Sequence, residues 1–513
     1  MLINVYPYLG RSHVCWHVYG LLHRAERNYN EAIKAYKQAL RIDADNLQIL
    51  RDLSLLQVQM RDLPGFEVTR QNILNLKSNQ KINWLAFAVS KHLNGDREGA
   101  IKVIKVYLES LHPESSEKRK KCFETSELLM YLNSVMSEIP DNDENVLENL
   151  EEIKDLIVDK MSWSYERGVA LLRIGDYESS RNVFETLLKN GDSENYRTHS
   201  GYMCAILKVD RATIEESLKL KGTDTIATMF VLTPSQIETL TQNYCGELSE
   251  YLPKSYAVRR IPLTFLEGEA LKEALDKYCR RDIRKGTPFL GQDIATLFFK
   301  EKEFAPDSPP RKIIARDPVD VQENKTYQIV FGLVNEFVTS LSASNPHFPN
   351  SDEEESTSSL LWCLYLKAQL LEFSGDLTNA KNMIEKCIEH TPTCIDILEK
   401  KAHLLKMSGD LKAAIETIDH ARTFDEKDRY INNVTTKYLL LGNREKDALE
   451  CISKFTRHEG DPSQNLHDMQ CIWYALDLAA CLARQRKWGL SLKTYGKISY
   501  IYSFSGFLSS FPL

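Results

Sequence analysis

The amino-acid sequence predicts an all-α fold in which helical hairpins repeat along the chain and stack into a right-handed superhelical solenoid. Three observations support this prediction. Glycine and proline are scarce, at 22 and 17 of 513 residues, which disfavours loop-rich all-β folds. An N-terminal block and a C-terminal block of the sequence each contain a pattern of residues that repeats every 34 residues. Each block is amphipathic, and a single hairpin cannot bury its apolar stripe alone, so neighbouring hairpins have to stack.

The N-terminal block begins with a Trp-x2-Tyr-Gly-x2-His string at Trp16, followed by an Ala-x3-Tyr string at Ala32. Trp84 and Ala100 stand at the corresponding places two repeat lengths further on. This pattern is that of the tetratricopeptide (TPR) repeat, a pair of antiparallel helices. Small residues at the alanine and glycine positions let the two helices approach closely, and large residues fill the spaces between units.

The C-terminal block repeats with equal regularity. Three turn residues lie 34 residues apart: Gly375, Gly409 and Asn443. Three alanines share the same spacing: Ala380, Ala414 and Ala448. Glycine or asparagine supplies the tight turn between the two helices of a hairpin, and a further unit of this kind is centred on Gly175-Asp176. The alternative is a non-repeating helical bundle whose spacings coincide.

The regularity of the pattern divides the chain into six segments. They are an unmatched N-terminal segment (1–12), an N-terminal TPR array (13–195), irregular helical repeats (196–304), a helical segment flanked by Pro/Ser-rich and acidic loops (305–359), a C-terminal TPR array (360–498) and an aberrant tail (499–513). Residues 342–359 have the acidic, Ser-rich composition of a disordered loop. The tail is aromatic, with neither charge nor helical period, so we expect poor order after residue 498.

Composition disfavours several classes of function. The chain has 65 Lys+Arg against 72 Asp+Glu and a formal net charge of −7, whereas proteins that bind nucleic acid over their whole surface are usually basic. We therefore expect no DNA partner. The 11 cysteines include no Cys-x-x-Cys pair, which fits buried thiols in a reducing compartment. The N-terminus lacks the features of a signal peptide, and no apolar run is long enough to span a membrane. We therefore expect a cytosolic or nuclear protein that has no membrane partner.

Sequence signatures of catalysis are missing. The chain has no Gly-x4-Gly-Lys-Ser/Thr, His-Glu-x-x-His, Gly-x-Gly-x-x-Gly or Gly-x-Ser-x-Gly string, which are the usual sites for phosphates, zinc, dinucleotides and a nucleophilic serine. The acetyl-CoA pyrophosphate loop Arg/Gln-x-x-Gly-x-Gly/Ala is missing too. We predict no catalytic residue, no metal site and no intrinsic cofactor.

One cluster of cations is a candidate site for a phosphate-rich partner. It comprises Lys277, Arg280, Arg281, Arg284 and Lys285. If the segment is a helix, these five side chains share one face. Such a face can bind the backbone of ribosomal RNA through salt-sensitive contacts. An ordinary solvated helix surface is the alternative.

A second cluster stands at groove-facing positions of the C-terminal repeats. It comprises His403 and Lys406 in one unit and Lys437 in the next, where Arg429 opens the unit. Side chains of this kind can hold an anionic ligand or an acidic partner segment. Ordinary groove polarity is the alternative.

Several strings of the sequence resemble the TPR auxiliary subunit of the NatA N-terminal acetyltransferase. They are far more specific than the spacing of the repeat, and the resemblance covers residues 11–498. The strings include His13–Leu22, Asp45–Gln57, Val258–Leu266, Cys451–Arg457 and Met469–Trp473.

The resemblance implies a non-catalytic scaffold that wraps a GNAT-fold catalytic subunit and reshapes its active site. The partner would bind acetyl-CoA and acetylate the α-amino group of nascent chains that have lost their initiator Met, with Ser, Ala, Thr, Gly, Val or Cys next in line. The complex would work at the ribosome in the cytoplasm, with the nucleus as a second location.

The resemblance also implies an inositol hexakisphosphate site near the contact with the catalytic subunit. The family binds it with a Lys-Ala-Lys-x-x-Lys-His string, which here begins at Lys401 and continues through Lys406 to Met407. His403 replaces a family lysine and Met407 replaces the family histidine. The candidate contacts are Lys401, His403, Lys406, Arg429 and Lys437.

A generic TPR adaptor or co-chaperone that clamps acidic peptides in its groove is the alternative function. The 395–462 block offers His403, Lys406, Asn433 and Lys437 for such a clamp. The family also has further repeats before His13 and beyond Lys497, a difference that either an incomplete gene model or a short isoform would explain.

Overall fold

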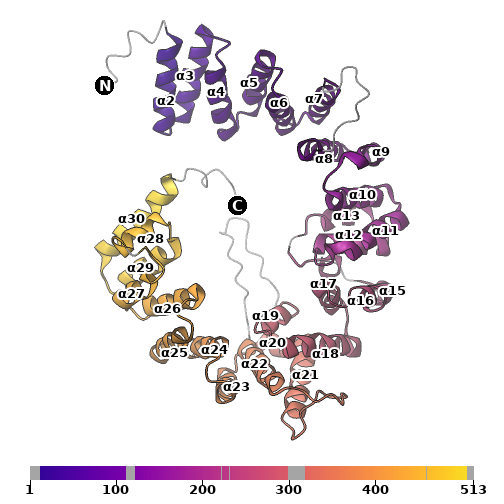
Figure 1. Cartoon of the computed structure of the whole chain (residues 1–513), viewed down its shortest axis with the longest axis vertical. Coiled ribbons are helices and arrows are strands. Elements are labelled where there is room, and N and C mark those ends of the chain that lie inside the picture. The colour runs from indigo at the N-terminus through magenta and orange to yellow at the C-terminus, as the bar shows by residue number, and fades with distance from the viewer. Residues whose placement is uncertain are drawn as a thin grey trace. The chain divides into compact units, whose positions relative to one another are not determined.

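The protein is described by a computed structural model that covers residues 12–110, 122–220, 222–229, 232–298, 318–457 and 459–504, with the backbone alone for 318–320 and 499–504. All regular elements within these ranges are helices (Figure 1). The chain divides into two compact units, residues 1–258 and 259–513. The predicted all-α class is therefore confirmed.

The first unit consists of successive helical hairpins that become shorter and less regular toward its end. Consecutive helices pack on each other as pairs, and the second helix of each early pair also packs on the first helix of the next. Its helices are α2 (His13–Ala25), α3 (Tyr29–Ile42), α4 (Leu47–Gln59), α5 (Leu63–Leu76), α6 (Lys81–Leu93), α7 (Arg97–Ser110), α8 (Phe123–Ser137), α9 (Asp143–Ile153), η2 (Lys154–Leu156), α10 (Lys160–Ile174), α11 (Tyr177–Leu187), η3 (Leu188–Asp192), α12 (Tyr196–Leu207), α13 (Arg211–Ser217), α14 (Ile226–Met229), α15 (Pro234–Thr241), η4 (Gln242–Leu248), α16 (Ser249–Tyr251) and α17 (Tyr256–Arg260).

The second unit has a long helix, α18, near its start and ends with regular hairpins. Its regular pairs are α22 with α23, α24 with α25, α26 with α27 and α29 with α30. Its helices are η5 (Ile261–Thr264), α18 (Gly268–Lys285), α19 (Leu290–Ala295), α20 (Pro318–Glu323), α21 (Lys325–Leu341), α22 (Thr357–Phe373), α23 (Leu377–His390), α24 (Ile395–Met407), α25 (Leu411–Phe424), α26 (Arg429–Leu441), α27 (Glu445–Ser453), α28 (Pro462–Asp468), α29 (Ile472–Arg484) and α30 (Trp488–Phe504).

The turns inside the hairpins confirm the 34-residue register. The three predicted turn residues have positive φ angles: Gly375 (82°), Gly409 (89°) and Asn443 (61°). The same spacing joins three residues of the first unit with positive φ: Arg27 (61°), Arg61 (59°) and Gly95 (89°). Arginine has no intrinsic preference for this left-handed conformation, so the sequence alone did not reveal the first two turns.

An aspartate next to the turn begins the second helix of several hairpins. The side chains of Asp176, Asp376 and Asp410 each accept a hydrogen bond from a backbone N–H three residues further on, at 3.0–3.1 Å. These bonds satisfy donors that the first turn of a helix leaves without a partner. The Gly-Asp pairs in the sequence therefore combine a turn residue with a helix cap.

The small residues of the repeat lie where two helices meet. Five alanines of the pattern are fully buried: Ala32, Ala100, Ala380, Ala414 and Ala448. A methyl group built on Gly20 would lie 2.4 Å from the ring of Tyr36, and one on Gly168 would lie 2.8 Å from the ring of Phe184. These positions have no room for a longer side chain, as the repeat pattern predicts.

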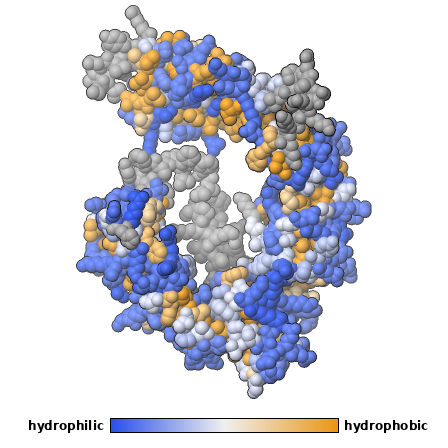
Figure 2. Space-filling view, in the orientation of Figure 1, coloured by the Kyte–Doolittle hydropathy of each residue, from blue (hydrophilic) through white to orange (hydrophobic). Residues whose placement is uncertain are grey.

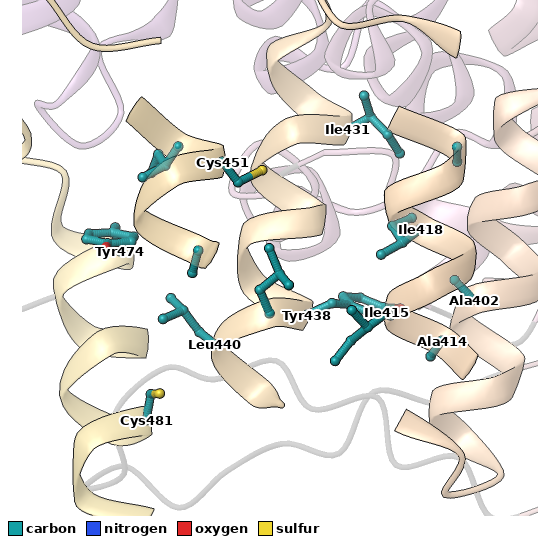
Figure 3. Packing of buried hydrophobic residues seen from close by; sticks show 14 of the residues in the cluster. Ala402, Ala414, Ile415, Ile418, Ile431, Tyr438, Leu440, Cys451, Tyr474 and Cys481 are labelled. Carbon is teal, nitrogen blue, oxygen red and sulfur yellow. The ribbon is translucent and has the colours of Figure 1, made fainter. Parts of the chain in front are cut away.

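The core of the C-terminal array is continuous across three hairpins. Ala402 and Ala414 face each other between α24 and α25, and the row continues through Ile418 to Tyr438 on α26 (Figure 3). Tyr474 and Cys481 on α29 belong to the same cluster. Each hairpin thus covers its apolar stripe with the next one, which is the stacking that the repeat requires.

The acidic segment 342–356 is ordered, so our prediction of disorder was wrong. Phe348 is fully buried and its ring lies 5.0 Å from the ring of Phe337 on α21. The backbone N–H of Glu355 donates to the carbonyl of Pro346 at 2.8 Å, and α22 begins at Thr357. The burial of Phe348 and the contacts with Arg280 and Arg284 of α18 hold the segment in one conformation, although its composition is typical of disorder.

Helix α30 continues past residue 498 to Phe504, whereas the expectation of poor order stays a prediction for residues 505–513. No glycine or proline interrupts residues 497–504, so a helix that begins at Trp488 can propagate through serine and aromatic residues at small cost. The rest of the tail, 505–513, and the Pro/Ser-rich stretch at 305–310 lie outside the described residues.

Candidate functional site

The predicted groove cations lie on α24 and α26, and two of them are held by carboxylates. Lys401 forms an ion pair with Glu385 at 2.9 Å, and His403 Nε2 lies 3.0 Å from Glu372 Oε1. Lys400, which the sequence analysis did not select, forms a further ion pair with Glu372 at 3.0 Å. These cations therefore join α24 to the preceding hairpin.

Glu372 is the centre of this polar cluster. Its side chain is only 4% exposed. Burial would raise its pKa, but the hydrogen bond from His403 and the charge of Lys400 more than offset burial and hold the pKa at about 2. The buried carboxylate is therefore ionised at neutral pH and needs its cationic neighbours.

The other three groove cations lie over aromatic rings. The Lys406 ammonium is 5.0 Å from the ring centre of Tyr438, and the Lys437 ammonium is 5.1 Å from that of Trp473. The Arg429 guanidinium lies 5.4 Å from the ring centre of Phe455. Tyr438 and Trp473 belong to later helices, so the lysine contacts connect successive units, whereas Phe455 follows α27 in the same hairpin as Arg429. The cations keep their positive charge in these contacts.

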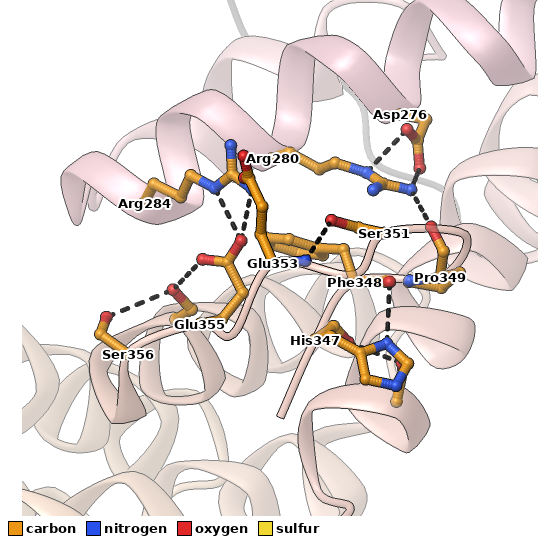
Figure 4. Close-up of polar contacts among 12 residues, drawn as sticks. Asp276, Arg280, Arg284, His347, Phe348, Pro349, Ser351, Glu353, Glu355 and Ser356 are labelled. Atoms are coloured by element: carbon orange, nitrogen blue, oxygen red, sulfur yellow. Dashed lines mark hydrogen bonds and ion pairs between the residues drawn. The ribbon is translucent and has the colours of Figure 1, made fainter. Parts of the chain in front are cut away.

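The second predicted cluster lies on α18, where the five cations have different environments. Lys277 is 75% exposed and pairs with Glu273 at 2.8 Å. Arg280 pairs with Asp276 at 2.7 Å and also donates to the carbonyl oxygen of Pro349 at 2.7 Å (Figure 4). The guanidinium of Arg280 lies near the rings of both Phe337 and Phe348, 5.5 and 5.1 Å from their centres.

Arg284 binds the acidic segment 342–356. It donates to Glu355 through Nε at 2.8 Å and pairs with Glu353 at 3.1 Å (Figure 4). Its guanidinium also lies 5.5 Å from the ring of Phe348. Arg280 and Arg284 thus bind a segment of the same chain, and the sequence gave no sign of this because their partners lie about seventy residues further on.

Arg281 and Lys285 stand on the same helix beside Asp282. Burial raises the pKa of Asp282, and the charges of Arg259, Lys285 and Arg281 partly oppose that rise. Lys277 and Lys285 are exposed. The part of α18 that remains open to a partner is therefore smaller than the predicted five-cation face.

Neither cluster has the composition of a metal or redox centre. In the described ranges no group of three or more His, Cys, Asp or Glu side chains could hold a metal ion. None of the helices resolved there is long and apolar enough to cross a bilayer. Six of the 11 cysteines are buried.

Repeated helical hairpins with a 34-residue register and charged residues on the open faces of their helices define a TPR-type scaffold. A TPR repeat model matches residues 13–46. The model described as "N-terminal acetyltransferase A, auxiliary subunit" matches residues 123–305 and 320–505. The chain therefore belongs to the family of NatA auxiliary subunits, which confirms the resemblance read from its sequence.

Individual relatives agree with this assignment. The chain is 38% identical over 488 residues to the N-terminal acetyltransferase A complex auxiliary subunit NAA15 of Arabidopsis thaliana, covering 94% of the chain and 49% of the relative. It is 34% identical over 484 residues to the NatA auxiliary subunit N-alpha-acetyltransferase 16 of Homo sapiens, covering 94% and 50%. The chain spans about half the length of the curated relatives it matches.

A solved structure shares the fold over nearly the whole chain. A chain of the structure of Naa15/Naa10 bound to HypK-THB matches with a TM-score of 0.77 and 30% sequence identity. The match covers 97% of this chain and 66% of that one. The all-α repeat solenoid is thus shared with a member of the family.

Proposed function

We propose that the chain is a non-catalytic scaffold that binds a GNAT-fold acetyltransferase subunit and supports N-terminal acetylation by that partner. The observation that carries the proposal is the structural match over 97% of the chain to Naa15/Naa10. Membership of a family of auxiliary subunits supports the same role. A co-chaperone-type adaptor has no comparable support, because the family match extends through both units.

The physical basis of a scaffold role is the stack of hairpins. In a stack of hairpins, the first helices of successive hairpins form a long surface that can contact a partner at many points. The partner would supply the acetyl-CoA site and the transfer step, whereas this chain would fix the partner's conformation.

The substrates we propose are nascent chains at the ribosome in the cytoplasm, with the nucleus as a second location. Support for ribosome contact comes from the exposed side chains of Lys277 and Lys285, with Arg281 on the same helix, whereas Arg280 and Arg284 bind the 342–356 segment. Contacts to RNA phosphates release counterions, so such binding weakens as salt rises.

We also propose inositol hexakisphosphate as an anionic ligand of the α24–α26 cations. Lys406, Arg429 and Lys437 lie over aromatic rings and keep their charge, which suits a polyanion. Lys401 forms an ion pair with Glu385, and His403 is hydrogen-bonded to Glu372. The residues present therefore fit the ligand with fewer cations than the family string supplies.

Co-expression with a Naa10-type subunit tests the scaffold proposal. The two chains should elute together on size exclusion, and the complex should acetylate peptides that begin with Ser or Ala. The isolated chain should show no transfer. Activity of the isolated chain, or separate elution of the two chains, would contradict the proposal.

Ribosome co-sedimentation tests the role of α18. Arg281→Glu with Lys285→Glu should weaken co-sedimentation and reduce its salt dependence, while co-elution with the catalytic subunit is preserved. Lys102→Glu with Lys105→Glu is a matched control, because both residues are exposed cations on α7. Equal sedimentation of the α18 variant and the wild type would mean that these residues form only a solvated helix surface and do not bind the ribosome.

A further inference from the structure

The first helices of the three N-terminal hairpins carry a row of solvent-exposed aliphatic side chains. Eight such residues on α2, α4 and α6 are between 36% and 65% exposed: Val14, Val18, Leu21, Leu55, Val58, Ile82, Val89 and Leu93. In the space-filling view, hydrophobic residues gather at the surface of this part of the chain (Figure 2). We call these eight residues the aliphatic row.

Three members of the aliphatic row occupy the same position of the repeat. Leu21, Leu55 and Val89 each lie six residues before the positive-φ residue of their hairpin, which is Arg27, Arg61 or Gly95. Equivalent positions of stacked repeats point the same way. The row therefore runs along one face of the array rather than being scattered over it.

The packing of a hairpin does not require an aliphatic residue at this position. In the C-terminal array the same position, six residues before Gly375, Gly409 and Asn443, is filled by Gln369, His403 and Lys437. The fold thus accepts polar residues there. The exposed aliphatic side chains of the N-terminal array leave apolar area in water, a cost that a covering partner would remove.

The open faces of neighbouring helices are held side by side. His17 and Arg24 on α2 both bind Asp52 on α4, at 2.9 and 3.1 Å. Helix α5 packs against both α4 and α6. In the next hairpin the equivalent residue, Val135, lies six positions before Asp141 and is fully buried. The aliphatic row is therefore contiguous on α2 and α4, continues to α6 and ends there.

Among the described residues, the aliphatic row has one unpaired cation beside it. Helices α2, α4 and α6 contain four cations, of which three are paired with carboxylates: Arg24 with Asp52, Lys81 with Glu124, and Lys91 with Glu67 and Asp96. Asp52 is already bound to His17 and Arg24. Arg51 is exposed, four residues before Leu55, and pairs with no carboxylate in the parts of the chain that the structure describes.

A second cation adds to the charge beside Arg51. Burial and the charge of Arg51 lower the pKa of Arg70 on α5, and the Arg70 Nε is buried without a hydrogen-bond partner among the described residues. A partner that covers the aliphatic row therefore meets uncompensated positive charge, which carboxylates would neutralise.

We propose that the aliphatic row binds an amphipathic helix of another protein, with aliphatic side chains on one face and aspartate or glutamate at its borders. Its aliphatic side chains contact the three equivalent positions at Leu21, Leu55 and Val89. Its carboxylates lie near Arg51. This mode of recognition, an apolar helix face laid on an apolar surface with charged borders, fixes both position and orientation.

Two synthetic peptides serve as probes with the full chain. One is a fluorescein-labelled amphipathic peptide with leucine on one face and glutamate on the other, and the second has lysine in place of every glutamate. Fluorescence anisotropy should detect binding of the glutamate peptide. The lysine peptide should bind at least about tenfold more weakly, since charge complementarity is lost.

Variants test the site on the chain. Replacing Leu21, Leu55 and Val89 together by Gln should weaken binding of the glutamate peptide at least about tenfold, and Gln is compatible with the fold because Gln369 occupies the same position. A control replaces Ile42, Val68 and Val106 by Gln, which are aliphatic residues of similar exposure on the second helices. The control should bind as the wild type does, and circular dichroism should report the same melting temperature for both variants.

Four results would overturn the proposal. They are no binding of the glutamate peptide, equal binding of the lysine peptide, equal binding by the variant at the aliphatic row, and loss of binding in the control variant. Concentration-dependent dimerisation of the wild type in sedimentation velocity that the aliphatic-row variant abolishes would assign the row to a second copy instead. Binding to vesicles of anionic lipid without binding to the glutamate peptide would assign it to a membrane.

Discussion

A buried histidine should make the first unit less stable in mildly acidic solution. His199 on α12 is fully buried. Its Nε2 lies 2.9 Å from the Ser193 carbonyl, to which it donates, and its Nδ1 lies 3.1 Å from the Tyr244 hydroxyl. Burial lowers its pKa from 6.5 to about 4, although the Ser193 hydrogen bond and the charges of Glu194 and Asp192 oppose the shift.

The direction and size of the effect follow from this pKa. Between pH 6.5 and 4 the unfolded chain binds a proton at this histidine and the folded chain does not, so folding becomes less favourable as the pH falls. The shift corresponds to about 3 kcal/mol in full, of which about 2 kcal/mol is lost on going from pH 7.5 to pH 5. Opening of α12 should then be about thirty times more frequent at pH 5.

Hydrogen exchange of peptides from α12 measures this opening, after correction for the intrinsic pH dependence of exchange. Carboxylates elsewhere also titrate, so the informative quantity is the difference between the wild type and His199→Gln. Glutamine keeps a donor but binds no proton, and its protection should change far less with pH. His420→Gln is the control, because His420 is exposed on α25. An equal pH dependence of α12 protection in wild type and His199→Gln would refute the reasoning.

Three further predictions concern the second unit. Ala414→Leu should lower the free energy of unfolding by about 1–3 kcal/mol through overpacking, measured by thermal denaturation, whereas exposed Ala44→Leu should have little effect; an unchanged melting temperature for Ala414→Leu would mean that the repeat register is wrong. Phe348→Ala should cost about 3–5 kcal/mol and make residues 342–356 sensitive to limited proteolysis, and Glu354→Ala should leave them resistant; resistance in both would show that Phe348 does not anchor the segment. Because the pKa of Glu372 is lowered to about 2, its stabilising contribution should be present above pH 4.5 and disappear as the pH falls toward 2; Glu372→Gln should flatten this part of the unfolding profile, and an unflattened profile would exclude Glu372 as its source.

The sequence by itself determined the repeat. Gly375, Gly409 and Asn443 mark turns whose conformation depends on the residue at that position, and Ala414 marks a close contact between helices that are neighbours in the chain. Interactions within a hairpin and between consecutive hairpins span few residues, so a periodic pattern records them directly. The strings that identify the family are equally local.

Local sequence patterns did not predict the conformation of residues where the neighbouring helices impose it. Arg27 and Arg61 adopt positive φ angles because the two helices of each hairpin must be joined at the same place, not because arginine favours that conformation. The same holds for the end of α30, where the helix that starts at Trp488 continues through residues with no period of their own.

Only the tertiary structure decided which cations remain available to a partner. The spacing of Lys277, Arg281 and Lys285 correctly predicts a common helix face, but the use of Arg280 and Arg284 depends on Phe348, Glu353 and Glu355, which fold back onto α18 from a distant part of the chain. In the groove, likewise, Lys406 and Lys437 lie over rings of later helices. A charge is visible in the sequence, but its partner is set by long-range packing, and that packing determines whether the charge binds within the chain or outside it.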